Sequence, residues 1–274
     1  MALHWPTFFT RLGSAIVFSI IMMVGLLWNV WAFFALIAII QVLCVREYFG
    51  LMQKMFPEII TPRNIVLGVQ TFGLLLLLLI ALEGHFGVGI LFFPALLLLS
   101  GLLHKSGSVH LFMMLTGCIV YVIFPLSLLL MLRLISIMIP LALVLMIWMN
   151  DTMAYLVGSF IGKTPFSKIS PKKTWEGTVG GALLTLIGAA IWGYFSPYYH
   201  LVDWIVLGLC ASIAGTAGDL FESKLKRVAN VKDSGSIMPG HGGALDRFDS
   251  LLLATPFAFS YAAVFMPKLS LLIF

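Results

Sequence analysis

Four carboxylate side chains late in the sequence have the spacing of a site for a hard cation. Asp219 and Glu222 stand three residues apart and Ser223 follows directly, so a helix places all three on one face. Asp246 and Asp249 repeat this spacing where a later apolar run begins. Oxygen ligands suit Mg²⁺, which proteins usually hold through one or two carboxylates plus substrate phosphates. We therefore predict Asp219, Asp246 and Asp249 as metal ligands at two helix ends. Helix capping is the simpler alternative for Asp246 and Asp249.

Basic side chains lie among these carboxylates. The stretch 219–249 holds five of the 11 carboxylates and five of the 16 Lys and Arg residues of the chain. Lys226, Arg227, Lys232 and Arg247 suit the clamping of phosphate oxygens beside a metal, as in phosphoryl or nucleotidyl transfer. Salt bridges among the same charges are the alternative interpretation.

A glycine-rich run at 239–243 adds flexible backbone whose N–H groups can approach phosphates. It is not a Walker loop, which has a different spacing of glycine and lysine. His241 lies inside this run and has two interpretations. It either carries a proton or donates to phosphate, or it only orients the loop.

Asp151 stands near the end of another apolar run. An ionisable group that faces lipid at this depth costs roughly 2.5–3.5 kcal/mol. We therefore predict that Asp151 faces the protein interior, water or a cation. The alternative is a side chain at a helix end that reaches into solvent.

A second polar segment, at 162–177, is rich in lysine. Its densest part holds Ser170, Lys172, Lys173 and Thr174, followed by Trp175. Two ammonium groups, two hydroxyls and an aromatic plane suit a nucleotide polyphosphate or a lipid phosphate. An ordinary anchor of positive charge beside a membrane is the alternative.

The rest of the chain is the hydrocarbon that must position these groups. Of its 274 residues, 61% are hydrophobic and 10% charged, whereas soluble domains have about 25% charged residues. A soluble core cannot absorb so much apolar surface, and the continuous apolar runs do not alternate as the strands of a membrane barrel do. We predict an all-α polytopic membrane protein with about nine spans. They are 12–28, 30–49, 65–82, 86–103, 109–131, 134–158, 177–196, 201–222 and 250–272.

The distribution of charge supports these spans. With nine spans, 14 of the 16 Lys and Arg residues fall on the side of the N-terminus. Cytoplasmic loops carry the Lys and Arg excess, so the N-terminus and the polar loops are predicted to be cytoplasmic. We divide the chain into N-terminal helices (1–135) and a catalytic region (136–274) with loops at 159–176 and 223–249. Anionic lipids and nucleotides are the expected partners on this basic face, and nucleic acid is not.

The polar block resembles a known family signature. Residues 223–249 follow the pattern Ser223-x-Leu-Lys226-Arg227-x4-Lys232-Asp-x-Gly-x3-Pro-x-His241-Gly-Gly-x2-Asp246-Arg247-Phe-Asp249. This pattern is similar to the signature of phosphatidate cytidylyltransferases, which are also called CDP-diacylglycerol synthases. The segments Ser170–Gly177 and Asp151–Gly158 also resemble family segments, so the resemblance covers about 148–255. Met238 and Ala244 depart from the larger aliphatic residues common in the family, at packing positions only.

The resemblance implies an enzyme that joins CTP and phosphatidic acid into CDP-diacylglycerol and pyrophosphate, in phospholipid biosynthesis. It implies a Mg²⁺ requirement, with a second cation as an option, and a polar cavity open to the cytoplasm of a bacterial inner membrane. The predicted catalytic set is Asp219, Asp246, Asp249, Lys226, Arg227 and His241, and the predicted substrate-binding set is Asp151, Ser170, Lys172, Lys173, Thr174, Ser223, Lys232 and Arg247.

Other functions remain open on the residues alone. One alternative is another CTP-dependent lipid enzyme, such as a CDP-archaeol-type synthase or a polyprenol kinase. A lipid transporter is a second, although paired broken helices in two matching halves are not evident in this sequence. A homodimer is a further option for the assembly.

Overall fold

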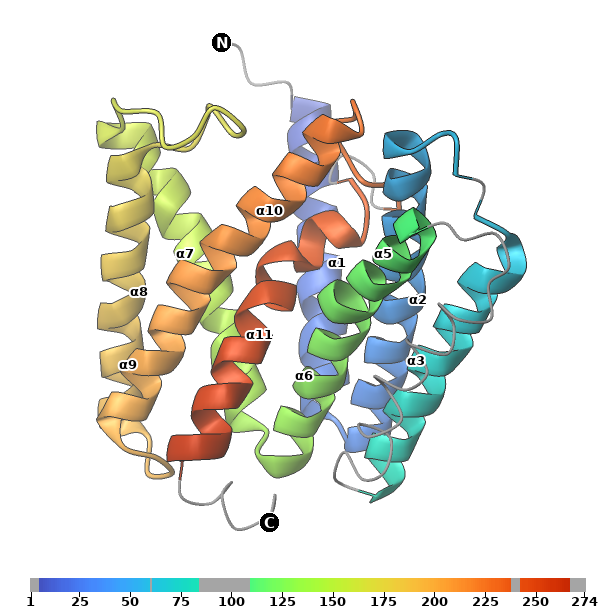
Figure 1. The fold of residues 1–274 in the computed structure, drawn as a ribbon. Coiled ribbons are helices and arrows are strands. Elements are labelled where there is room, and N and C mark those ends of the chain that lie inside the picture. The colour runs from blue at the N-terminus through green and yellow to red at the C-terminus, as the bar shows by residue number, and fades with distance from the viewer. Residues whose placement is uncertain (1–4, 60, 84–108, 238–241, 267–274) are drawn as a thin grey trace. The chain divides into compact units, whose positions relative to one another are not determined.

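The computed structural model describes residues 5–59, 61–83, 109–237 and 242–266, and these residues form helices joined by short loops (Figure 1). The helices are α1 (Trp5–Leu27), α2 (Val30–Met55), α3 (Arg63–Glu83), α5 (Val109–Cys118), α6 (Phe124–Ile135), α7 (Met138–Ile161), α8 (Trp175–Phe195), α9 (Leu201–Leu209), α10 (Gly215–Val228) and α11 (Leu245–Phe265). Two π-helical turns, η1 (Ile119–Ile123) and η2 (Cys210–Ala214), join α5 to α6 and α9 to α10.

Seven helical segments of the described residues are long and apolar enough to cross a membrane. A shorter apolar helix, Gly13–Leu27, precedes them within α1. The all-α polytopic prediction is confirmed. The predicted break at Asn29 is also confirmed, because its side chain caps α2 by accepting a hydrogen bond from the Ala32 N–H at 2.8 Å. The predicted span 86–103 lies outside the described residues.

The chain separates into two compact units. Unit 1 consists of Met1–Leu134 and Val228–Arg247. Within it, α2 packs against α1, α3, α5 and η1. The Arg133 guanidinium donates to the Leu26 carbonyl at 2.8 Å, which provides this half-buried cation with a backbone partner from a distant part of the sequence.

Unit 2 consists of Ile135–Arg227 and Phe248–Phe274. Its main packing is between α7 and α8, with α9 and η2 against both. Glycines allow α7 and α8 to approach closely: a Cβ on Gly181 would lie 2.7 Å from the Ala154 Cβ, and one on Gly177 would lie 2.6 Å from the Ala154 carbonyl. Small residues at a helix interface are the usual means of bringing membrane helices together.

The polar loops are shorter than predicted. Residues 159–161 belong to α7, and 175–176 to α8. At the second loop, α10 continues to Val228 and α11 begins at Leu245, so Ser223, Lys226 and Arg227 are helical. Asp219 therefore stands inside a helix and not at its end, which corrects the prediction. Lysine and arginine are good helix formers, so α10 continues where the apolar run stops.

Candidate functional site

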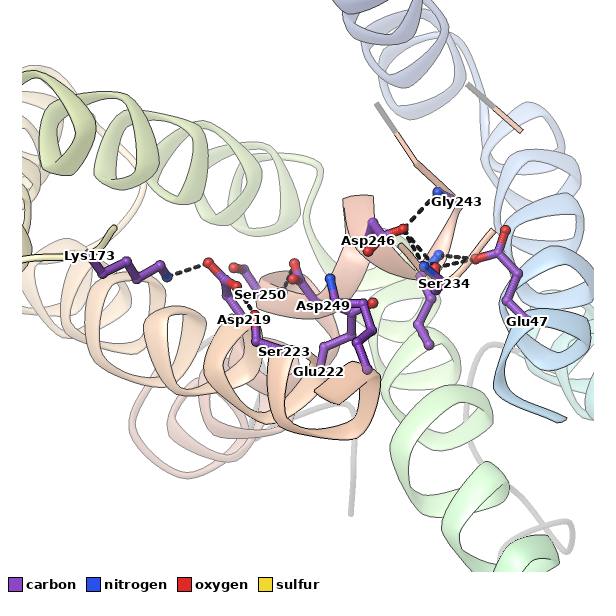
Figure 2. Close-up of polar contacts among 12 residues, drawn as sticks. Glu47, Lys173, Asp219, Glu222, Ser223, Ser234, Gly243, Asp246, Asp249 and Ser250 are labelled. Atoms are coloured by element: carbon purple, nitrogen blue, oxygen red, sulfur yellow. Dashed lines mark hydrogen bonds and ion pairs between the residues drawn. The ribbon is translucent and has the colours of Figure 1, made fainter. Parts of the chain in front are cut away.

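Lys173, Asp219, Ser223 and Asp249 form a charged group in unit 2, which we call the α10 cluster (Figure 2). Lys173, from the loop before α8, forms an ion pair with Asp219 on α10. The Ser223 hydroxyl donates to Asp219 Oδ1 at 3.2 Å from one turn further along the same helix. The predicted alignment of Asp219 and Ser223 on one helical face is thus confirmed. Both members of the ion pair keep about a quarter of their side-chain surface exposed (27% and 28%).

Asp249 is the buried member of the α10 cluster, with 9% of its surface exposed. The Ser250 N–H donates to its Oδ1 at 2.6 Å. The carboxylates of Asp219 and Asp151 and the ammonium of Lys226 all lie within electrostatic range of it. Three predicted site carboxylates, from α7, α10 and α11, therefore belong to one unit and lie within electrostatic range of Asp249.

Gly218 explains how α10 and α11 come so close here. A Cβ at this position would overlap the Asp249 carbonyl oxygen and lie 3.0 Å from the Leu253 Cβ. Only a residue without a side chain fits at this position. A hydrogen bond from the Asn150 amide to the Thr216 hydroxyl, at 3.4 Å, joins α7 to α10 beside Asp151.

Lys226 is paired with a carboxylate that the sequence analysis left without a role. Its ammonium forms an ion pair with Glu222, one turn earlier on α10, and Glu222 is completely buried. Charged groups removed from water in this way need an opposite charge. Charge compensation of Glu222 is thus one established task of Lys226, besides the predicted contact with phosphate.

The lysine loop is held by Glu176, in the first turn of α8. Its carboxylate accepts from the Lys163 N–H at 3.1 Å, from the Thr164 N–H at 3.1 Å and from the Thr164 hydroxyl at 2.8 Å. Thr174 caps α8 by accepting from the Gly177 N–H at 3.1 Å. Thr174 thus has a structural task as well as its predicted substrate contact, and the loop that carries Lys173 is anchored at both ends.

Asp246 lies in a second polar group, in unit 1, made of Glu47, Ser234 and Asp246 with the N–H groups of Gly243, Ala244 and Leu245. We call it the α2 cluster (Figure 2). Asp246 Oδ2 accepts from the Ser234 N–H at 2.8 Å, the Ser234 hydroxyl at 2.9 Å and the Gly243 N–H at 2.7 Å. The carboxylate of Asp246 thus holds the backbone that precedes α11.

Glu47, on α2, is the residue of this cluster that sequence reasoning missed. Its Oε1 accepts from the Ala244 N–H at 2.9 Å, and its Oε2 accepts from the Leu245 N–H and from the Ser234 hydroxyl, both at 2.8 Å. The available signal was a carboxylate inside the predicted span 30–49. An ionisable residue within a span is a functional candidate by default.

The other predicted residues are more exposed. Lys172, Arg227, Lys232, Arg247 and Asp151 are exposed, and Ser170 is half-buried. The Ser170 carbonyl accepts from the Lys173 N–H at 3.1 Å, which shapes the lysine loop. His241 lies outside the described residues.

A divalent cation fits the chemistry of the α10 cluster. Across the described ranges, no group of three or more His, Cys, Asp or Glu side chains is arranged to hold a metal ion. However, buried Asp249 has two further carboxylates within electrostatic range. Like charges in an apolar setting are costly unless a cation compensates them, and an oxygen-only donor set suits Mg²⁺.

The fold and these clusters define an all-helical integral membrane protein that carries charged residues within its apolar helices and in the loops between them. A sequence model of the cytidylyltransferase family matches residues 9–265. The chain therefore belongs to the cytidylyltransferase family, as its signature predicted.

Curated relatives carry a more specific name. The chain is 44% identical over 128 residues to the phosphatidate cytidylyltransferase of Synechocystis sp., which covers 45% of this chain and 43% of the relative. It is 46% identical over 124 residues to that of Bacillus subtilis, covering 43% and 45%. For phosphatidate cytidylyltransferase 4, chloroplastic, of Arabidopsis thaliana, the values are 45% over 113 residues, covering 41% and 29%. The aligned part is thus less than half the length of each relative.

Proposed function

We propose that this chain is a phosphatidate cytidylyltransferase that converts CTP and phosphatidic acid into CDP-diacylglycerol and pyrophosphate. The observation that carries the proposal is the α10 cluster, in which a buried aspartate lies with a second aspartate and a lysine in unit 2. Family membership and the names of the curated relatives support the same reaction.

In the proposed reaction, an oxygen of the lipid phosphate attacks the α-phosphorus of CTP. The new P–O bond forms as the bond between the α-phosphorus and the bridging oxygen to the β-phosphate breaks, and pyrophosphate leaves with that electron pair. The lipid phosphate is itself the nucleophile, so no side chain of the protein has to form a covalent intermediate. Catalysis then consists of holding two polyanions in line and stabilising charge, as in other phosphoryl transfers.

The chain's own residues divide this work. Lys173 already pairs with a carboxylate, and with Lys172 it offers ammonium groups from the lysine loop. When substrate phosphate enters, Lys173 is available to exchange its Asp219 partner for phosphate oxygens. Arg227, in the same unit, is exposed and serves the same purpose. Asp219 and Asp249 would hold Mg²⁺, which when bound supplies positive charge for the phosphate oxygens, while Asp246, which belongs to unit 1, stays a predicted ligand.

We propose that the site faces the cytoplasm, where CTP is available, and opens at the membrane surface that phosphatidic acid occupies. The basic residues of the polar loops support this orientation through the positive-inside rule. A bacterial inner membrane is the proposed location.

The test uses the purified full-length chain in vesicles with phosphatidic acid and CTP labelled at either the α- or the γ-phosphate. We expect the α-label in the lipid product and the γ-label in released pyrophosphate, both dependent on Mg²⁺. Transfer of the γ-label to lipid would identify a lipid kinase and would refute the proposal. Absence of any labelled lipid in the presence of phosphatidic acid and Mg²⁺ would refute it as well.

A further inference from the structure

Glu47, on α2, holds Ser234 and the backbone at the start of α11 through hydrogen bonds. It is separated by 187 residues from Ser234 and by 198 residues from Leu245, yet it accepts hydrogen bonds from both. All the atoms of this contact belong to unit 1. The α2 cluster is therefore a long-range connection between an N-terminal helix and the family's signature segment.

The Glu47 carboxylate occupies the position that an external anion would take at a helix N-terminus. Leu245 is the first residue of α11, and Ala244 directly precedes it. Their N–H groups donate to the two oxygens of Glu47 at 2.8 and 2.9 Å. The preceding N–H, of Gly243, points to Asp246. Helix N-termini attract anions because their first N–H groups lack partners within the helix. Here those groups are already occupied by the protein's own carboxylates.

Two glycines leave the space that this carboxylate needs. A Cβ on either Gly235 or Gly243 would overlap the Glu47 carboxyl group. The backbone on both sides of Glu47 is therefore shaped around its side chain. Hydrogen bonds to a charged acceptor are stronger than neutral ones, so the contact is well suited to hold a loop in one conformation.

We propose that Glu47 is a positioning residue, which fixes Ser234 and residues 243–245 so that Asp246 and the basic residue beside it have a defined place. A consequence is that the N–H groups of residues 243–245 do not cradle substrate phosphate. Lysine and arginine side chains perform that task instead. The kinetic part of this inference rests on the proposed function, whereas its structural part does not.

The test compares Glu47→Gln and Glu47→Ala with Glu58→Gln, in which an exposed glutamate after the same helix is changed. The first measurement is hydrogen–deuterium exchange of the peptide 242–247 in the full-length protein. We expect exchange of the Ala244 and Leu245 amides to rise about tenfold or more in Glu47→Ala, less in Glu47→Gln, which keeps one acceptor oxygen, and not at all in Glu58→Gln. Unchanged exchange in both Glu47 variants would refute the inference.

The second measurement is cytidylyl transfer at varied CTP. We expect the KM for CTP to rise about tenfold in Glu47→Ala, with a smaller rise in Glu47→Gln. A residue that only supports folding would lower the amount of active protein and leave this KM unchanged. If the wild-type chain makes no CDP-diacylglycerol, the proposed function fails while the exchange experiment still decides the role of Glu47.

Gly235→Ala tests the contact from its other side and covers the case in which Glu47→Ala does not fold. The added methyl displaces the Glu47 carboxylate, so the variant should reproduce the exchange and KM changes in the wild-type background. In the Glu47→Gln background it should add less than the sum of the two single effects, because both changes weaken one contact. Strict additivity would contradict the proposal.

Discussion

The two polar clusters of this protein are built on opposite principles. In the α2 cluster, six hydrogen bonds satisfy the carboxylates of Glu47 and Asp246. In the α10 cluster, buried Asp249 accepts a hydrogen bond from the Ser250 N–H and lies within electrostatic range of two further carboxylates. A satisfied network stabilises a conformation, whereas concentrated like charge is costly and is retained for function. The comparison assigns positioning to the first cluster and chemistry to the second.

The largest effect is expected from removing the buried charge of the α10 cluster. Asp249→Asn should lower transfer from α-labelled CTP by a factor on the order of 10³, because the charge that meets the cation is lost. The melting temperature in detergent should not fall, since a repulsive buried charge is removed. Full activity, or a large loss of stability without loss of activity in the folded fraction, would reverse the assignment.

The Glu222–Lys226 pair should behave as a structural contact although it is close to the chemistry. Lys226→Ala removes the ammonium beside a completely buried carboxylate, and breaking such a pair costs about 3–5 kcal/mol. Thermal unfolding should therefore occur at a clearly lower temperature. Lys224→Ala, at an exposed position on the same helix, is the matched control and should leave the melting temperature unchanged. Equal behaviour of the two variants would exclude a stabilising role for this pair.

The α2 cluster should show the inverse of the Asp249 result. Ser234→Ala removes the hydroxyl that contacts both Glu47 and Asp246, and hydrogen bonds to charged groups contribute about 1.5–3 kcal/mol. We expect a lower melting temperature and only a few-fold loss of activity in the folded fraction. Ser236→Ala, at an exposed position in the same segment, serves as the control. A loss of activity as deep as that of Asp249→Asn would assign chemistry to the α2 cluster too.

The smallest effect is expected at the cap of α8. Thr174→Ala removes the acceptor for the Gly177 N–H, at a cost of about 1 kcal/mol. The neighbouring Lys173 loses part of its support, so the KM for CTP should rise slightly in the transfer assay. Thr174→Ser retains the oxygen and should restore both stability and KM. Failure of serine to restore them would point to a substrate contact of the threonine itself.

Much of this organisation follows from local sequence. Asp219 and Ser223 are one helical turn apart, so their alignment needs no knowledge of the fold. Glu176 is 12 or 13 residues from the backbone it anchors, within a segment that the sequence analysis had already singled out. The continuation of α10 to Val228 was missed because hydropathy marks where an apolar run stops, not where a helix ends.

The amino-acid sequence by itself determined the class of protein, the family and most of the charged residues of the candidate site. Periodic spacing, continuous apolar runs and a dense signature are properties of neighbouring residues, so they can be recognised without coordinates. Only the tertiary structure decided that Asp249 is buried among carboxylates, that Lys173 meets Asp219 and that Glu47 holds the start of α11. These interactions join residues far apart in the chain, and only the packing of the helices and their loops brings such residues together.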